Sequence, residues 1–287
     1  MTPVPALVGV VGGGRMGAGI AHAFALAGSN VAVIERDSPS VQLARGRVLA
    51  AIMTSVERKT TRETAEDLTA RVGFGMDFAA LAEAELVIEA VPESLEFKVD
   101  ALGRAEAAVS PLAWLASNTS SISITTLGQS MQRPERFCGM HFFNPVPPSK
   151  LVEIVVGKET ADELVAAAQR WVEAIGKTPI TVNDVPGFAS SRLGVALGLE
   201  AIRMLEDGVA SAEDIDAAMA LGYGHPMGPL KLTDVVGLDV RLGIAEYLHV
   251  MLGDRFEPPK LLRDMVERGE LGRKSGKGFY EWPQEQK

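Results

Sequence analysis

The chain has 287 residues, of which 47% are hydrophobic, and a formal net charge of −9. This composition predicts a globular protein with a sizeable core, and the acidity argues against nucleic acid as a main partner. No apolar run is long enough to cross a bilayer, so no membrane partner is expected. The single cysteine, Cys138, leaves no intrachain disulfide and favours a reducing compartment. Met1 to Val11 lacks the pattern of a secretion signal, so we expect a cytoplasmic protein.

Short apolar runs alternate with amphipathic stretches over the first two thirds of the chain. The predicted strands are Leu7–Val11, Val31–Ile34, Leu86–Ala90, Trp114–Ser117, Phe137–His141, Val152–Val156 and Pro179–Val182. The predicted helices are Met16–Ala27, Val41–Glu57, Leu95–Ala108 and Asp162–Ile175. Because strands that are apolar on both faces alternate with helices, the pattern predicts a mostly parallel sheet covered by helices, a Rossmann-type α/β domain over residues 1–184.

The pattern changes after the turn-forming stretch that begins at Asn183. No convincing strand follows, and the helical stretches are Phe188–Glu206, Glu213–Leu221, a segment that ends near Leu252, and Pro259–Arg268. Ser211 with Asp214 resembles a capping box at the start of the second of these helices. We therefore predict an all-helical second domain over residues 185–287.

A glycine-rich turn follows the first predicted strand. The stretch Gly12-Gly13-Gly14-Arg15-Met16-Gly17 contains the spacing G-x-G-x-x-G between a strand and a helix. In such a turn Gly12 permits the sharp bend, Gly14 lets the backbone approach a pyrophosphate, and Gly17 lets the helix pack on the strand. The helix N-terminus, with Arg15 and Met16, adds unpaired N–H groups for the phosphates. The context predicts a dinucleotide site.

Glu35 ends the second predicted strand and is placed to accept hydrogen bonds from the adenine ribose. A carboxylate at this position repels a 2′-phosphate, so NAD is favoured over NADP. Arg36 is the counter-argument, because an arginine at this place can pair with a 2′-phosphate; a solvated surface charge is an equally good interpretation.

His141 is the candidate catalytic residue among the four histidines. It ends an apolar strand, and ligands of parallel sheets bind beyond the carboxyl ends of the strands. A neutral imidazole is a suitable base for removing a hydroxyl proton while hydride leaves the same carbon. Glu153 lies between Val152 and Ile154, where a carboxylate is costly to bury unless it is paired. The intervening turn can bring Glu153 beside His141; the alternative is an exposed glutamate on an edge strand.

A run of polar residues, Asn118-Thr119-Ser120-Ser121, follows another predicted strand. Its hydroxyls and amide are candidates for binding a substrate oxygen. The alternative is that one of Ser120 and Ser121 caps a helix over Ser123–Gln129 while the other faces the ligand. No metal site is predicted.

Several motifs in order resemble those of the 3-hydroxyacyl-CoA dehydrogenases, particularly the short bacterial 3-hydroxybutyryl-CoA type. They are the glycine turn, Glu89-Ala90-Val91-Pro92-Glu93 with Lys98, Ser117 to Ser121, His141-Phe142-Phe143-Asn144-Pro145-Val146-Pro147, Leu151-Val152-Glu153, Pro186-Gly187-Phe188, and Gly272-Arg273-Lys274-Ser275-Gly276 followed by Gly278-Phe279-Tyr280. The resemblance spans the whole chain, and the stretch that begins at His141 is the most specific part of it.

The resemblance implies a role for several single positions. His141 would be the general base, Glu153 its partner, and Ser120 a hydrogen-bond donor to the 3-oxygen of an acyl-CoA substrate. The implied cofactor contacts on the nicotinamide side are Glu93, Lys98 and Asn144, with Lys274 also near the cofactor. The helical domain would form a homodimer, and the active site would lie in the cleft between the domains.

One position departs from the family pattern. The family has an asparagine before the arginine that follows Pro-Gly-Phe, and this chain has Ser191 before Arg192. A serine can still act through a water, but a lost polarising contact costs on the order of 10²–10³ in rate. Two alternatives therefore stay open: a dehydrogenase of a non-CoA 3-hydroxy acid, and a weakly active cofactor-binding module.

Overall fold

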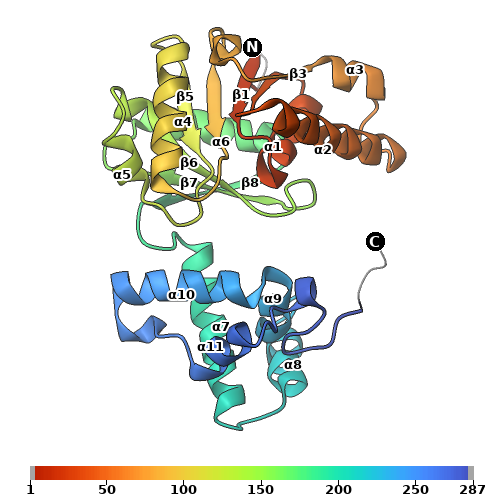
Figure 1. Cartoon of the computed structure of the whole chain (residues 1–287), viewed down its shortest axis with the longest axis vertical. Helices are drawn as coiled ribbons and strands as arrows, with labels where there is room; N and C mark the ends of the chain where they lie inside the picture. Colours follow the sequence, from red (N-terminus) through yellow and green to blue (C-terminus); the bar gives the residue numbers. More distant parts are fainter. Residues whose placement is uncertain (1–3, 284–287) are drawn as a thin grey trace. The chain divides into compact units, whose positions relative to one another are not determined.

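The computed structural model describes residues 4–283 and divides into two compact units (Figure 1). The first unit ends at Val185 and the second begins at Pro186. In the first unit an eight-stranded sheet is covered by helices, and the second unit is helical. The predicted fold class, a mostly parallel Rossmann-type sheet followed by a helical part, is confirmed.

The sheet of the first unit has the order β3-β2-β1-β4-β5-β6-β7-β8. Its strands are β1 (Leu7–Val11), β2 (Asn30–Ile34), β3 (Val72–Gly75), β4 (Leu86–Glu89), β5 (Trp114–Ser117), β6 (Phe137–Phe142), β7 (Leu151–Val156) and β8 (Thr178–Asn183). All neighbours are parallel except β6 and β7, which are antiparallel. The strand order reverses direction at β1, where β2 lies on one side and β4 on the other, so the carboxyl ends of β1 and β4 border the crevice typical of dinucleotide sites.

Helices cover both faces of this sheet. They are α1 (Arg15–Leu26), α2 (Ser38–Glu57), α3 (Ala65–Ala70), α4 (Leu95–Ala108), α5 (Ile124–Gly128) and α6 (Asp162–Ala174), with 3₁₀ turns η1 (Phe78–Leu81) and η2 (Pro134–Arg136). Side chains of α1, α2 and α6 share one buried cluster with alternate residues of the strands. The other set of alternate strand residues faces η1 and α4, as shown by Gly9, where an added Cβ would lie 2.6 Å from Leu81.

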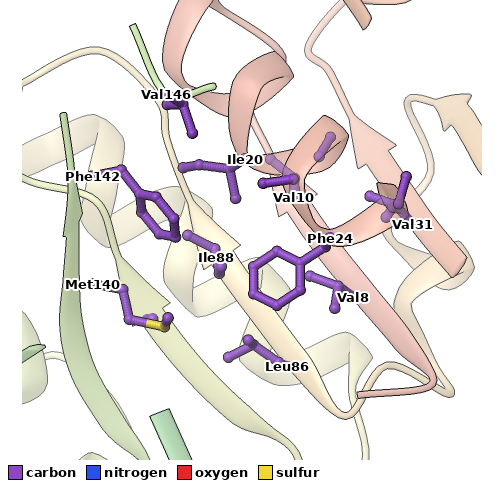
Figure 2. Close-up of a cluster of buried hydrophobic side chains, with 14 of the residues drawn as sticks. Val8, Val10, Ile20, Phe24, Val31, Leu86, Ile88, Met140, Phe142 and Val146 are labelled. Carbon is purple, nitrogen blue, oxygen red and sulfur yellow. The ribbon is translucent and has the colours of Figure 1, made fainter. Parts of the chain in front are cut away.

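The centre of the core lies where α1 crosses the strands (Figure 2). Phe24 and Ile20 point from α1 toward Val10 of β1 and Ile88 of β4, and all four are fully buried. Burying each of these side chains contributes about 1.5–3 kcal/mol. The glycine turn therefore begins a helix that is held rigidly on the sheet.

The sequence prediction did not include β3 and α3. The four residues of β3 contain two glycines, and α3 is a six-residue helix, so neither carries enough periodic pattern to be recognised. Pairing of β3 with β2 completes the edge of the sheet next to the end of β2.

The second unit is built from helices α7 (Ser190–Glu206), α8 (Ala212–Gly222), α9 (Pro229–Val236), α10 (Leu238–Leu252) and α11 (Lys260–Glu267), with 3₁₀ turns η3 (Asp254–Phe256) and η4 (Arg273–Ser275). Ser211 caps α8 by accepting a hydrogen bond from the backbone N–H of Asp214, as its capping pattern predicts. Two buried carboxylates tie the unit together. Asp216 accepts from the backbone N–H groups of Leu230 and Lys231, and Asp234 accepts from Phe279 and Tyr280.

Candidate active site

The glycine turn has the geometry that a dinucleotide requires. Gly12 has a φ of +94°, which only glycine adopts without strain. A Cβ on Gly17 would lie 1.8 Å from the carbonyl oxygen of Gly12. The first turn of α1 can therefore pack this closely on the glycine turn only because residue 17 has no side chain. A Cβ on Gly14, in contrast, would meet no described atom within 4 Å. Gly14 is therefore the point at which the backbone is open to a ligand.

No side chain neutralises the partial positive charge at the N-terminus of α1, so this end of the helix can bind an anion. Gly14 is the N-cap and offers no side chain, and the first turn contains no acidic residue. Arg15 is exposed and Met16 is half-buried at the first two helical positions. Unpaired N–H groups at a helix N-terminus bind phosphate through their partial positive charge. These residues fit the pyrophosphate of NAD.

Glu35 lies directly after β2 and is bound to the glycine turn. One carboxylate oxygen accepts from the backbone N–H of Gly13 at 2.7 Å, and the other from the N–H of Arg36 at 3.3 Å. Arg36 itself is 82% exposed and its guanidinium pairs with Asp37 at 3.1 Å. A negative carboxylate beside the turn and an arginine engaged elsewhere both suit an unphosphorylated ribose, so the residues fit NAD.

His141 and Glu153 lie directly opposite each other on the antiparallel strands β6 and β7. His141 Nδ1 and Glu153 Oε2 are 2.7 Å apart, and Glu153 is fully buried. The alternative of an exposed edge-strand glutamate is wrong, because β8 pairs with the far side of β7. When Nδ1 donates to the carboxylate, Nε2 is left as the proton acceptor of a neutral ring. The pair has the arrangement of a base and the group that orients it.

The turn that follows His141 is held against the cofactor-binding helix. Val146 packs on Gly19 of α1, where an added Cβ would lie 2.7 Å from the Val146 side chain. The ammonium of Lys177 donates to the carbonyl oxygens of Val146 and Ser149 at 2.6 and 2.5 Å. Asn144 lies exposed in this turn. The small residue on α1 thus brings the histidine's turn next to the dinucleotide-binding element.

A buried charge cluster lies at the carboxyl ends of β4 and β5. Lys98 of α4 binds both oxygens of Glu89 at 2.8 and 3.1 Å, and both side chains are 1% exposed. Ser117 also donates to Glu89, and Lys98 is 3.2 Å from a carboxylate oxygen of Glu93. Glu93, Lys98 and their partners therefore form one network at the edge of the sheet where a ligand would lie.

Glu93 accepts hydrogen bonds from hydroxyl and backbone N–H groups of the loop that follows β5. Its Oε1 accepts from the hydroxyl of Thr119 at 2.6 Å, from that of Ser121 at 2.8 Å, and from the backbone N–H groups of Ser120 and Ser121 at 3.0 Å. Burial alone would raise the pKa of Glu93, but the charge of Lys98 and these hydrogen bonds outweigh it and lower that pKa to about 2. Glu93 is thus a fixed anion that orders the polar loop.

The loop after β5 differs from the prediction in the residue that caps the next helix. Neither Ser120 nor Ser121 caps the next helix; the N-cap of α5 is Ser123, whose hydroxyl accepts from the N–H of Thr126. Ser120 Oγ lies 3.3 Å from Glu93, within the polar network beside β4. Asn118 binds the backbone N–H of Phe142 through its side-chain oxygen at 2.9 Å, next to His141.

Glu89 had no predicted role of its own, and Asn118, whose amide was predicted as a candidate for binding a substrate oxygen, has a structural contact that was not predicted. Glu89 anchors Lys98, and Asn118 fixes the backbone beside His141. Glu89 carries a recognisable signal, because a carboxylate that ends an apolar strand needs a cation within reach and Lys98 is nine residues away. The hydrogen bond to Asn118 joins the end of β5 to β6, and no local sequence pattern predicts it.

The remaining predicted residues lie in the second unit. Ser191 is in the first turn of α7, and Lys274 is in η4. The ammonium of Lys274 pairs with both oxygens of Asp239, in the first turn of α10, at 2.5 and 2.6 Å. The contact of Lys274 with the cofactor stays a prediction.

The fold and the glycine turn thus define an NAD-binding α/β protein with a histidine–glutamate pair at the carboxyl edge of its sheet. Models of the two parts of one family match nearly the whole chain. The NAD binding domain of 3-hydroxyacyl-CoA dehydrogenase matches residues 7–185, and the C-terminal domain of 3-hydroxyacyl-CoA dehydrogenase matches residues 187–282.

Relatives and solved structures agree with this match. The chain is 42% identical over 275 residues to a probable 3-hydroxybutyryl-CoA dehydrogenase of Deinococcus radiodurans, with 96% of this chain and 99% of the relative covered. It is 40% identical over 284 residues to a 3-hydroxybutyryl-CoA dehydrogenase of Bradyrhizobium diazoefficiens, with 98% and 97% covered. The crystal structure of (S)-3-hydroxybutyryl-CoA dehydrogenase from Ralstonia eutropha superimposes with a TM-score of 0.92 at 39% identity and covers 98% of this chain and 100% of that one.

The chain belongs to the 3-hydroxyacyl-CoA dehydrogenase family, and it is an NAD-dependent oxidoreductase. The predicted family, enzyme class and cofactor are confirmed. Within residues 4–283, no helix combines the length and apolar character needed to cross a bilayer.

Proposed function

We propose that the enzyme interconverts short-chain (S)-3-hydroxyacyl-CoA and 3-oxoacyl-CoA, such as 3-hydroxybutyryl-CoA and acetoacetyl-CoA, with His141 as general base and Glu153 as its partner. The observation that carries the proposal is the buried bond of 2.7 Å between His141 Nδ1 and Glu153, at the edge of the sheet that also bears the glycine turn. The names of the relatives from Deinococcus radiodurans and Ralstonia eutropha support the short acyl chain.

The proposed mechanism assigns one task to each side chain. NAD, when bound, supplies the hydride acceptor for C3 of the hydroxy substrate. His141 takes the proton of the 3-hydroxyl at Nε2, because Nδ1 is engaged with Glu153. The carboxylate of Glu153 stabilises the imidazolium that forms, and the hydroxyl of Ser120 donates to the 3-oxygen. In the reverse direction His141 returns the proton to the 3-oxo group.

Cofactor contacts follow the same assignment. We place the pyrophosphate on Gly12, Gly14 and Gly17 with the start of α1, the adenine ribose on Glu35, and the nicotinamide side near the Glu93–Lys98 ion pair. Asn144 and Lys274 complete the proposed cofactor set. We assign Ser191 to the catalytic group, acting through a water in the place of the family's asparagine amide.

The test is NADH oxidation measured with acetoacetyl-CoA and, in parallel, with free 3-oxo acids and with NADPH. We expect turnover with acetoacetyl-CoA and NADH, and much weaker turnover with NADPH. Turnover of the free acids alone would instead identify a dehydrogenase of a non-CoA 3-hydroxy acid. No turnover with either, at normal NADH binding, would identify a cofactor-binding module, the alternative that Ser191 keeps open.

His141→Ala separates the proposed chemistry from binding. We expect this variant to lose turnover of acetoacetyl-CoA while it binds NADH with an unchanged Kd. Turnover at the rate of the natural chain would exclude His141 as the base.

We also propose that the enzyme is a cytoplasmic homodimer. Three apolar side chains at helical spacing on α9, Leu232, Val235 and Val236, are each 38–41% exposed, which suits a surface covered by a second copy. Sedimentation equilibrium tests this, and a monomer at micromolar concentration would exclude it. The location rests on the single buried cysteine and is tested by cell fractionation.

A further inference from the structure

Three charged side chains at the carboxyl end of β4 do not cancel one another. Lys98 binds both oxygens of Glu89 at 2.8 and 3.1 Å, and its ammonium lies 3.2 Å from the carboxylate of Glu93. Among residues 4–283 these side chains form no ion pair except with one another. Two carboxylates thus face one ammonium, and one negative charge is left uncompensated.

Both carboxylates of this cluster are held in the charged form. Glu89 accepts from the ammonium of Lys98, the backbone N–H of Val91 and the hydroxyl of Ser117, and such donors favour a carboxylate over a carboxylic acid. Burial raises the pKa of Glu93, but the charge of Lys98 and the hydrogen bonds from the loop after β5 outweigh it and bring that pKa to about 2. Glu89 and Lys98 are 1% exposed and Glu93 is 37% exposed, so the excess charge lies on the member that is open to a ligand.

The cluster lies beside the glycine turn, on the side away from Glu35. Glu89 is the register partner of Val11, the last residue of β1, and a Cβ on Gly12 would lie 2.8 Å from the carbonyl oxygen of Ala90. Glu35 follows β2, which pairs with the opposite side of β1. When the pyrophosphate lies on the glycine turn and the adenine ribose on Glu35, the other half of the dinucleotide extends over β4 toward the cluster.

We propose that the net negative charge of this cluster strengthens the binding of NAD⁺ relative to NADH, and that Glu89 is the residue that determines this effect. The nicotinamide ring is positively charged in NAD⁺ and neutral in NADH, so only the oxidised form is attracted to the excess charge. Without the charge of Glu89, the ammonium of Lys98 would cancel that of Glu93, and the attraction would be lost. The inference rests on the proposed function, which places the nicotinamide side near Glu93 and Lys98.

The test compares the dissociation constants of NAD⁺ and NADH, both measured by titration calorimetry in the absence of acyl-CoA. Glu89→Gln and Glu93→Gln each remove the excess charge, and each should raise the ratio of the Kd of NAD⁺ to that of NADH by on the order of tenfold, as for one charge in a partly screened site. The double variant Glu89→Gln with Lys98→Met loses one charge of each sign and should keep the natural ratio. Asp100→Asn, at a 67% exposed position of α4 that pairs with Arg104, is the control and should also keep it.

A ratio that follows the net charge of the cluster supports the inference, because a purely structural role would weaken the binding of both cofactor forms alike. Two results would overturn it: an unchanged ratio in both Glu89→Gln and Glu93→Gln, or a ratio in the double variant that rises as it does in Glu89→Gln. Reduction of acetoacetyl-CoA by the natural chain would then show that the proposed function stands.

The two proposals can also fail the other way round. The expected shift in the ratio, without turnover of any thioester by the natural chain, would support the inference and refute the proposed function. Urea unfolding reports whether each variant folds. Because Glu93 is partly exposed, Glu93→Gln tests the inference even when a variant at a buried position does not fold.

Discussion

The strongest prediction concerns the carboxylate that holds His141. Glu153→Gln keeps the size and polarity of the side chain but removes the charge next to the imidazole. Glu153 is fully buried and 2.7 Å from His141 Nδ1, so water does not screen the interaction. A charge-assisted hydrogen bond contributes about 1.5–3 kcal/mol. Since each 1.36 kcal/mol is a factor of ten in rate, we expect kcat to fall by about 10- to 150-fold.

A second effect can enlarge this loss. An amide nitrogen that faces Nδ1 would favour the ring tautomer in which Nε2 carries the proton, and such a ring is not a base. In the serine-protease triad the corresponding amide substitution costs about 10⁴ in kcat, which we take as the upper limit here. The expected fall in kcat for Glu153→Gln is therefore about 10- to 150-fold from the lost charge-assisted bond alone, and up to about 10⁴-fold when the ring also takes the tautomer that is not a base.

The assay is steady-state reduction of acetoacetyl-CoA with saturating NADH, accompanied by the Kd of NADH from its fluorescence. We expect kcat to fall while this Kd is unchanged, because Glu153 lies away from the glycine turn along the sheet. Glu159→Gln, at an exposed glutamate after β7, is the control and should behave as the natural chain. If the kcat of Glu153→Gln stays within about threefold of the natural value, the loss is smaller than even the weakest charge-assisted bond predicts, and the reasoning is refuted.

Three further predictions follow from the packing and the buried charges. Gly14→Ala should leave the free energy of unfolding unchanged but raise the Kd of NADH by at least about tenfold, because the added Cβ enters open space that the pyrophosphate needs. Gly17→Ala should lose both stability and NADH binding, because its Cβ would lie 1.8 Å from a carbonyl oxygen. Equal Kd values for Gly14→Ala and the natural chain would contradict this prediction. Lys98→Met should destabilise the fold by about 3–5 kcal/mol in urea unfolding, because Glu89 is 1% exposed and would keep an uncompensated charge, and part of this loss should return when Glu89→Gln is added. Burial first, and the charge of Lys177 second, lower the pKa of His22 from 6.5 to about 4, so the unfolded chain binds the extra proton and stability is lost as the pH falls from about 6.5 to 4. The loss amounts to about 3 kcal/mol, and a His22→Gln chain with the same slope of unfolding free energy against pH would show that another group is responsible.

The sequence was sufficient for the local structure that carries a strong pattern. Alternation of apolar strands and amphipathic helices predicted the parallel sheet, because each pattern reports which side of one element is buried. The glycine turn was recognisable because three backbone positions between a strand and a helix demand a residue without Cβ, and that demand is local. The short β3 and α3 were missed because they contain too few periodic residues.

The candidate site was predictable only in part. His141 could be singled out because it ends a strand, and Glu153 because a carboxylate between apolar neighbours needs a partner. The assignment of the polar loop failed at one point: Ser123 caps α5, and Ser120 and Ser121 turn to Glu93. Either serine satisfies a capping pattern, so the choice depended on a carboxylate almost thirty positions earlier in the chain.

What the sequence determined by itself is therefore the class of the protein: the sheet, the dinucleotide turn and the residue types that a hydride-transfer enzyme requires. What only the tertiary structure decided is which of these side chains meet. The register of two antiparallel strands sets His141 against Glu153, and the packing of α10 on α7 buries Arg241 without a counter-ion among residues 4–283. Such pairings join residues far apart in the chain, and they follow from the global packing of elements whose local patterns would permit several other partners.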